Sequence, residues 1–125
     1  MFCFLRKIEF KYKTTTPLKD RKKKAEEIIK KYPDKVPIIL ERAPNSDINI
    51  ITSEKYVIPG CFDGNQLLYS LQYKLPKNSN QSLFLLIDGK ITFDLKTKVI
   101  DLYNKYKHDD DNFLYIMYSN ECVWG

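Results

Sequence analysis

The spacing of hydrophobic residues in the first third of the chain predicts a helix and then a strand. Apolar residues recur at helical intervals between Thr16, a preferred N-cap residue, and Pro33, before which a helix usually ends. Residues 36–42 are apolar and β-branched and predict a strand, with Pro37 either at its start or in an edge strand. Residues 8–15 indicate a short turn or strand before the helix.

A second strand and a second helix follow in the middle of the chain. Residues 55–59 have the composition of a short strand. Asp63 is followed three residues later by Gln66, and this spacing is typical of a capping box at the start of a helix. A stripe of leucines continues the helical pattern up to Pro76.

A hairpin, a helix and a buried strand complete the pattern. Residues 82–87 are strongly apolar and end at Asp88-Gly89, a favoured two-residue hairpin turn, after which residues 90–93 return. Helical spacing recurs over 99–106, and residues 113–118 are apolar on both faces, as in a central strand. This order of elements predicts an α+β fold. It follows the β-grasp pattern of ubiquitin-like domains, with basic helical material in front.

Composition and charge indicate one folded domain with a basic N-terminal quarter. A chain of 125 residues can bury one core, and 43% hydrophobic residues exclude a mostly disordered chain. Residues 1–31 contain 11 basic and four acidic residues, whereas the whole chain carries a net charge of +5. Such an asymmetry predicts a surface that meets anions. No apolar run approaches the roughly 20 residues of a membrane-spanning helix, so we expect a cytoplasmic protein.

Few residues have the pattern of a catalytic or metal site. His108 precedes three aspartates, but their spacing matches no calcium loop, so we expect a solvated turn. Cys61 has no histidine near it in sequence, and Cys3 and Cys122 lie too far away to form a zinc motif with it. We therefore predict no catalytic residue, no metal and no cofactor, and a protein that is not an enzyme.

Four segments of the chain carry a family resemblance, namely residues 30–39, 41–44, 55–59 and 113–119. They resemble the autophagy ubiquitin-like modifiers, the family of the microtubule-associated protein light chain and the GABA-receptor-associated protein. The resemblance runs from about Phe10 to Gly125. It implies a β-grasp domain with two N-terminal helices over residues 10–125, preceded by an N-terminal extension of residues 1–9.

The resemblance implies that the terminal residue, Gly125, is joined to phosphatidylethanolamine. The implied partners are activating and conjugating enzymes and a deconjugating cysteine protease. The acyl chains of the lipid would then hold the protein on an autophagosomal or related membrane. The tryptophan before the terminal glycine, Trp124, is also similar to the C-terminus of a sister autophagy modifier, which is joined to a protein lysine. That sister lacks the two N-terminal helices.

The resemblance also implies a docking site for receptor and adaptor peptides with an aromatic-x-x-aliphatic motif and acidic neighbours. Such a peptide would add as a strand beside residues 55–59. The alternative is that the apolar members of the set are plain core residues. By position, the aromatic pocket is Ile28, Pro37, Lys55, Val57 and Phe113, and the aliphatic pocket is Tyr56, Ile58, Pro59, Phe62 and Leu67.

Four polar residues would modify these pockets. Lys31 and Lys35 would meet the acidic flank of the peptide. Lys24 stands where the family commonly has an acidic residue near the aromatic pocket. Ser70 replaces an apolar residue in the aliphatic pocket. Because Lys24 and Ser70 alter the two pockets, the sequence does not determine which peptide is preferred.

A different class of protein is also compatible with the charge pattern. A non-conjugated basic module could bind nucleic acid or tubulin through the N-terminal helix, with strongly salt-dependent affinity. RNA binding would also need aromatic stacking surfaces. Tyr56 and Phe113 are better explained as pocket and core residues, so no nucleic-acid partner is expected.

Overall fold

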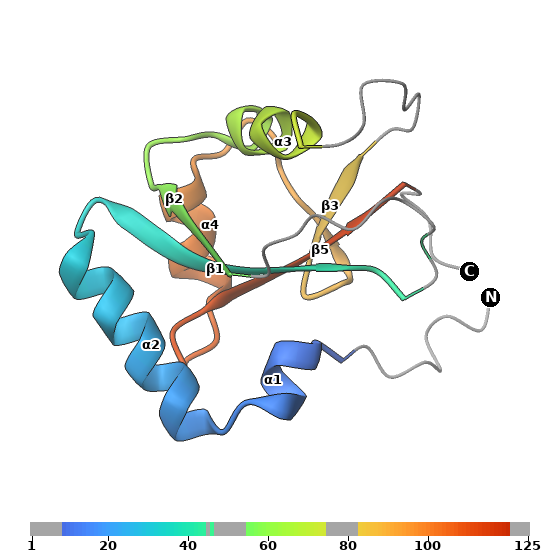
Figure 1. Ribbon diagram of the computed structural model, residues 1–125. Helices are drawn as coiled ribbons and strands as arrows, with labels where there is room; N and C mark the ends of the chain where they lie inside the picture. Colours follow the sequence, from blue (N-terminus) through green and yellow to red (C-terminus); the bar gives the residue numbers. More distant parts are fainter. Residues whose placement is uncertain (1–8, 45, 47–54, 75–82, 121–125) are drawn as a thin grey trace.

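The computed structural model describes residues 9–44, 46, 55–74 and 83–120, and a mixed β-sheet runs through this part of the chain (Figure 1). Helices α1 and α2 lie on one face of the sheet, and α3 and α4 lie on the other. The elements are α1 Lys11–Thr15, α2 Leu18–Lys31, β1 Lys35–Arg42, β2 Lys55–Pro59, α3 Gly64–Gln72, β3 Phe84–Ile87, β4 Ile91–Thr92, α4 Val99–Tyr106 and β5 Leu114–Ser119.

The last strand lies in the centre of the sheet, as its apolar sequence predicts. The strand order is β2-β1-β5-β3-β4, with β5 parallel to β1 and antiparallel to β3. All six residues of β5 are buried. The predicted α+β fold with a central closing strand is therefore confirmed.

Pro37 lies near the start of an internal strand, so the edge-strand alternative for residues 36–42 is wrong. It pairs with Val57 of β2, and β1 meets β5 only from Ile38 onward. Because Pro37 precedes this second ladder, its missing N–H removes no bond from the parallel pairing.

Side-chain alternation divides the core into two clusters, one on each face of the sheet. Ile38 and Leu40 of β1 pack in the cluster that α3 and α4 cover, whereas Ile39 between them packs in the cluster of α1 and α2. In β5, Ile116 belongs to the first cluster and Tyr115 to the second. Successive residues of a strand point to opposite faces, so both faces of this sheet are apolar.

The capping box predicted for α3 is confirmed. The side chain of Asp63 accepts a hydrogen bond from the Gln66 N–H at 2.8 Å, and the side chain of Gln66 accepts from the Asp63 N–H at 2.9 Å. Two N–H groups at the helix start are thereby satisfied within one short segment.

The N-terminal helices begin differently from the prediction. The N-cap residue of α2 is Pro17, which has no side-chain cap, so the prediction of Thr16 as the cap is wrong. The carbonyl of Thr16 instead accepts a hydrogen bond from Arg21 Nη1 at 2.6 Å. Lys11–Thr15 form α1, as the family resemblance implies, so the turn or strand indicated by the local pattern is wrong. The carboxylate of Glu41 in β1 accepts from the backbone N–H of Lys11 and of Tyr12, at 2.7 and 2.8 Å.

The hairpin at Asp88-Gly89 is present, with a register that differs by one residue. Both residues have positive φ, 56° and 74°, and the Lys90 N–H donates to the Ile87 carbonyl at 3.0 Å. Strand pairing resumes at Ile91, which is paired with Ile87, so three residues rather than two connect β3 to β4. Among the described residues, no helix has both the length and the apolarity that a membrane span requires.

Candidate functional site

Strand β2 forms one edge of the sheet and leaves a row of backbone groups available for a further strand. It pairs with β1 from Lys55 to Pro59, and within the described residues no strand lies on its other side. An open edge of this kind can pair with an extended peptide through main-chain hydrogen bonds.

The two faces of this edge lead to different apolar clusters. Val57 packs against the cluster that contains Ile28 of α2, whereas Ile58 belongs to the cluster that contains Leu67 of α3. In an extended peptide, two residues three positions apart point to opposite faces. The β2 edge therefore fits a peptide whose two apolar residues have that spacing.

On the α2 face, the predicted aromatic-pocket residues differ in accessibility. Val57 is half-buried and Lys55 is exposed, whereas Ile28 and Pro37 are buried. Phe113 is 0% exposed and packs edge-on against the Tyr12 ring, with 5.5 Å between ring centroids. Phe113 therefore belongs to the core beneath this face and does not line an open pocket.

On the α3 face, Pro59, Phe62 and Ser70 are partly exposed, while Ile58 is 8% and Leu67 only 1% exposed. Leu67 is thus a core residue beneath the predicted aliphatic pocket. Tyr56 pairs with Ile38 in the sheet, and its side chain lies outside the described part of the structure. A shallow pocket lies along the outside of α3, lined by Phe62, Asp63, Asn65, Gln66, Tyr69 and Ser70.

Three lysines give the α2 side of the edge a positive charge. Lys31 and Lys35 both extend over the ring of Tyr32, with their Nζ atoms 5.4 and 5.1 Å from its centroid. They therefore gather where α2 ends and β1 begins. Lys24 is exposed two helical turns earlier on α2. Gly125 lies outside the described residues.

A buried ion pair that the sequence pattern does not predict fixes the N-terminal helices to the sheet. Asp111 is 0% exposed, so the expected solvated turn is wrong for this residue. Its carboxylate accepts from Arg21 Nε at 3.0 Å, from the Tyr115 hydroxyl at 2.5 Å and from the Phe113 N–H at 3.0 Å. One signal was available: Arg21 lies on the helical face of Ala25 and Ile28, the face that is buried.

Two tyrosines beside this ion pair are held in their neutral form. Burial and the charge of Asp111 raise the pKa of Tyr103 to about 12, and its hydroxyl donates to the Asn112 carbonyl at 2.6 Å. Burial, together with the hydrogen bond to Asp111 and the charge of its carboxylate, also raises the pKa of Tyr115. Both hydroxyls therefore act as donors to groups that would repel a phenolate.

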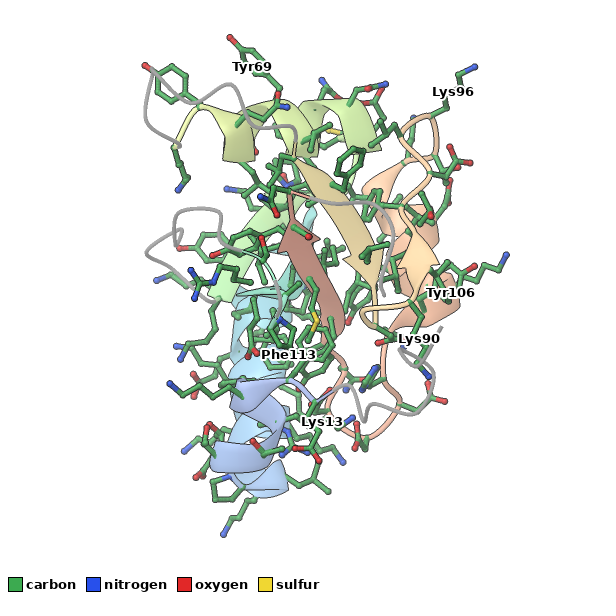
Figure 2. The ribbon with its side chains drawn as sticks, turned by 90° about the vertical axis from the view of Figure 1, so that its right-hand side faces the viewer. Lys13, Tyr69, Lys90, Lys96, Tyr106 and Phe113 are labelled. Atoms are coloured by element: carbon green, nitrogen blue, oxygen red, sulfur yellow. The ribbon has the colours of Figure 1, made fainter. Side chains whose placement is uncertain are left out.

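The turn before β5 brings together side chains of the types that bind metal ions in other proteins. His108, Asp110 and Asp111 have ligand atoms within 4.8 Å of one another. However, the Lys13 ammonium contacts His108 Nδ1 and lies 3.5 Å from Asp110 Oδ2, while Arg21 pairs with Asp111. These cations already compensate the carboxylates, so the cluster joins α1 and α2 to the turn (Figure 2 labels Lys13).

The sheet order, the central last strand and the helices on both faces define a ubiquitin-like domain. The family model described as autophagy protein Atg8 ubiquitin like matches residues 20–125. A crystal structure of Trypanosoma brucei ATG8 is similar, with a TM-score of 0.83 and 29% sequence identity over 94% of this chain and 99% of that chain. The chain therefore belongs to the Atg8 family of ubiquitin-like autophagy proteins, and the family predicted from the sequence is confirmed.

Proposed function

We propose that this protein is a ubiquitin-like modifier that is joined through Gly125 to phosphatidylethanolamine and that docks adaptor peptides at the β2 edge. The match to the family extends to Gly125, which supports the conjugation site. Its enzymatic partners would be activating and conjugating enzymes and a deconjugating cysteine protease. The attached lipid would place the docking edge on an autophagosomal or related membrane.

The observation that carries the docking function is the two-sided edge of β2. Val57 and Ile58 lead to apolar clusters on opposite faces, which suits an aromatic residue on the α2 side and an aliphatic residue on the α3 side. Main-chain hydrogen bonds to β2 would supply affinity for any extended segment, and the two faces would select the side chains. Lys24, Lys31 and Lys35 would attract acidic residues that flank the aromatic-x-x-aliphatic core.

Peptide titrations test the docking function. The probe is a labelled peptide with acidic residues on both sides of an aromatic-x-x-aliphatic core, and binding is measured by fluorescence anisotropy. We expect Lys31→Glu combined with Lys35→Glu to weaken binding about tenfold, because the acidic flank then meets like charge. The matched control changes two exposed lysines elsewhere, Lys90→Glu with Lys105→Glu, and alters the net charge equally.

The control also shows which part of the proposal holds. Equal weakening by both double variants would mean that the peptide responds to net charge and not to the β2 edge. Replacing the aromatic or the aliphatic residue of the peptide by alanine should remove binding to the unmodified protein. Retention of full affinity by either alanine peptide contradicts the two-sided docking site.

A conjugation assay tests the role of Gly125. The protein is incubated with activating and conjugating enzymes of the family, ATP and phosphatidylethanolamine liposomes, and its intact mass is measured. We expect a gain of one lipid that is lost in Gly125→Ala, whose circular dichroism should match that of the unmodified protein. A lipid gain in the variant refutes the assignment of Gly125, and attachment to protein lysines instead indicates the sister type of modifier.

A further inference from the structure

The outer face of α3 is uncharged in a chain that is otherwise rich in charge. No residue from Gly64 to Tyr73 is charged, although 30% of the chain is. Tyr69 and Tyr73 are 71% and 83% exposed, and Tyr69 projects away from the body of the molecule (Figure 2). Exposed tyrosines with few charged neighbours are typical of interaction surfaces.

The pocket beside Tyr69 contains several hydrogen-bond acceptors, together with the side-chain amide of Gln66, whose N–H groups are donors. Asn65 Nδ2 donates to the Leu95 carbonyl at 3.1 Å, which leaves Asn65 Oδ1 as its acceptor. The Ser70 hydroxyl donates to the Leu67 carbonyl at 2.7 Å, so its oxygen can still accept a bond. Asp63 uses Oδ1 to cap α3, and its second carboxylate oxygen remains an acceptor. These acceptors adjoin the rings of Phe62 and Tyr69.

The charges on the two faces beside the docking edge are different, although Lys35 pairs with Pro59 and so lies at the same end of β2 as the α3 pocket. Lys24, Lys31 and Lys35 lie toward α2, whereas the α3 pocket is lined by one acidic residue, Asp63, and by no basic residue. No lysine or arginine of the described residues forms a salt bridge with Asp63. Lys96, on the loop beside α3, extends away from the helix (Figure 2).

The proposed docking mode directs the end of the peptide to this pocket. The predicted aromatic site lies at Lys55 and Val57, whereas the aliphatic site lies at Pro59 and Phe62, so the peptide would run in the direction of β2. Residues after the aliphatic one would then continue onto α3. Phe62 and Ser70 are common to the predicted aliphatic pocket and the α3 pocket, and they join the two surfaces.

We propose that the α3 pocket binds an arginine that follows the aliphatic residue of the docked peptide, an inference that rests on the proposed docking function. A guanidinium group carries five N–H donors and no acceptor, which matches the acceptors of Asp63, Asn65 and Ser70. Its planar group can also stack on the Tyr69 ring. The preferred partner is then a peptide with acidic residues before the aromatic position and arginine after the aliphatic position.

Three peptides that differ only at the two positions after the aliphatic residue test this inference. These positions carry Arg-Arg, Ala-Ala or Glu-Glu, and affinity is measured by calorimetry. We expect the arginine peptide to bind about fivefold tighter than the alanine peptide, and the glutamate peptide to bind most weakly. The net charge of +5 favours the opposite order, so an arginine preference must come from local contacts.

Two variants locate the preference in the pocket. Asp63→Asn removes the charge while retaining a residue that caps helices well, and Tyr69→Ala removes the exposed ring. Each should abolish the arginine advantage and leave the affinity for the alanine peptide unchanged. Asp109→Asn removes an equal charge from the exposed turn before β5 and should preserve the advantage. Thermal unfolding of each variant checks that α3 stays folded.

The outcomes separate this inference from the docking function on which it rests. If the alanine peptide binds but arginine and glutamate peptides bind equally, or glutamate binds tighter, the arginine site is refuted and the docking edge stands. If no peptide binds, the docking function fails and the arginine site fails with it. If the arginine preference persists in both Asp63→Asn and Tyr69→Ala, the α3 pocket is not its source.

Discussion

Arg21 connects three parts of the chain through one guanidinium group. Its Nε donates to Asp111 at 3.0 Å, and its Nη1 donates to the carbonyls of Lys13 and Thr16 at 2.8 and 2.6 Å. The side chain thereby holds α1, the link to α2 and the turn before β5 in one arrangement. Because both charged groups are nearly or fully buried, each depends on the other for compensation.

Removing one member of this pair should therefore destabilise the whole domain. We expect Asp111→Ala to lower the free energy of unfolding by about 3–5 kcal/mol, because the Arg21 charge and the Tyr115 hydroxyl would remain buried without this acceptor. Urea unfolding followed by circular dichroism measures the change. Asp109→Ala, at an exposed position of the same turn, should cost less than about 0.5 kcal/mol. Similar losses in both variants would contradict the ion-pair account.

The sequence alone could not show which of the three aspartates after His108 is buried. Asp109, Asp110 and Asp111 are chemically identical, and the orientation of the turn depends on Arg21, which lies 90 residues away from Asp111 in sequence. Likewise, Phe113 and Leu67 belong to strand and helix patterns that are correct, but their depth depends on how the helices pack. Burial of a single side chain is a tertiary property, and periodicity predicts only its face.

At the scale of elements, the start of α3 was predictable from a local signal, whereas the start of α1 was not. Asp63 and Gln66 are three residues apart, so the start of α3 is encoded within one turn. Helix α1 has Phe10 as its N-cap residue without a side-chain cap. Its first N–H groups are satisfied by Glu41, a residue of β1. A cap that comes from a distant strand leaves no local pattern to find.

Glu41→Gln should therefore loosen α1 without disturbing the sheet. The two carboxylate oxygens of Glu41 accept from the N–H groups of Lys11 and Tyr12, whereas glutamine has only one side-chain oxygen to accept these bonds. Glutamine also lacks the negative charge that favours a helix start. We expect faster amide hydrogen exchange in Lys11–Thr15 and a loss of about 1 kcal/mol in stability. Glu26→Gln, an exposed change on α2, is the control. Unchanged exchange in α1 would show that Glu41 is not its cap.

Across the whole molecule, the sequence predicts the layers better than the site. The order of elements and the apolar central strand indicate the β-grasp arrangement, because alternation along β1 and β5 requires cover on both faces. The candidate docking residues came from a family resemblance. Nothing in the spacing of Val57 and Ile58 reveals that β2 is an open edge, since that depends on which strand occupies its other side. In the α3 pocket the sequence pattern predicts the Asp63–Gln66 bonds, but it contains no sign of the bonds of Asn65 to the Leu95 carbonyl and of Ser70 to the Leu67 carbonyl.

The buried phenols make the stability of the folded molecule sensitive to alkaline pH. Tyr103 donates to the carbonyl of Asn112 on the side of α4, and Tyr115 donates to Asp111 on the side of α2, so both faces depend on neutral hydroxyls near one turn. Burial, with the charge of Asp111, raises the pKa of Tyr103 from its ordinary value of 10.0 to about 12. The unfolded chain then releases this proton at lower pH than the folded chain does.

The contribution of Tyr103 to stability is therefore complete below pH 10.0 and is lost as the pH rises toward about 12. We expect the thermal midpoint to fall steeply across that interval. Tyr103→Phe should have a lower midpoint at neutral pH, because the bond to the Asn112 carbonyl is lost, but a shallower decline above pH 10.0. Tyr69→Phe provides the control, since Tyr69 is 71% exposed and should leave the slope unchanged. If Tyr103→Phe and the unmodified protein lose stability with the same slope, the alkaline sensitivity has another source, and the raised pKa of Tyr115 makes that residue the next to test.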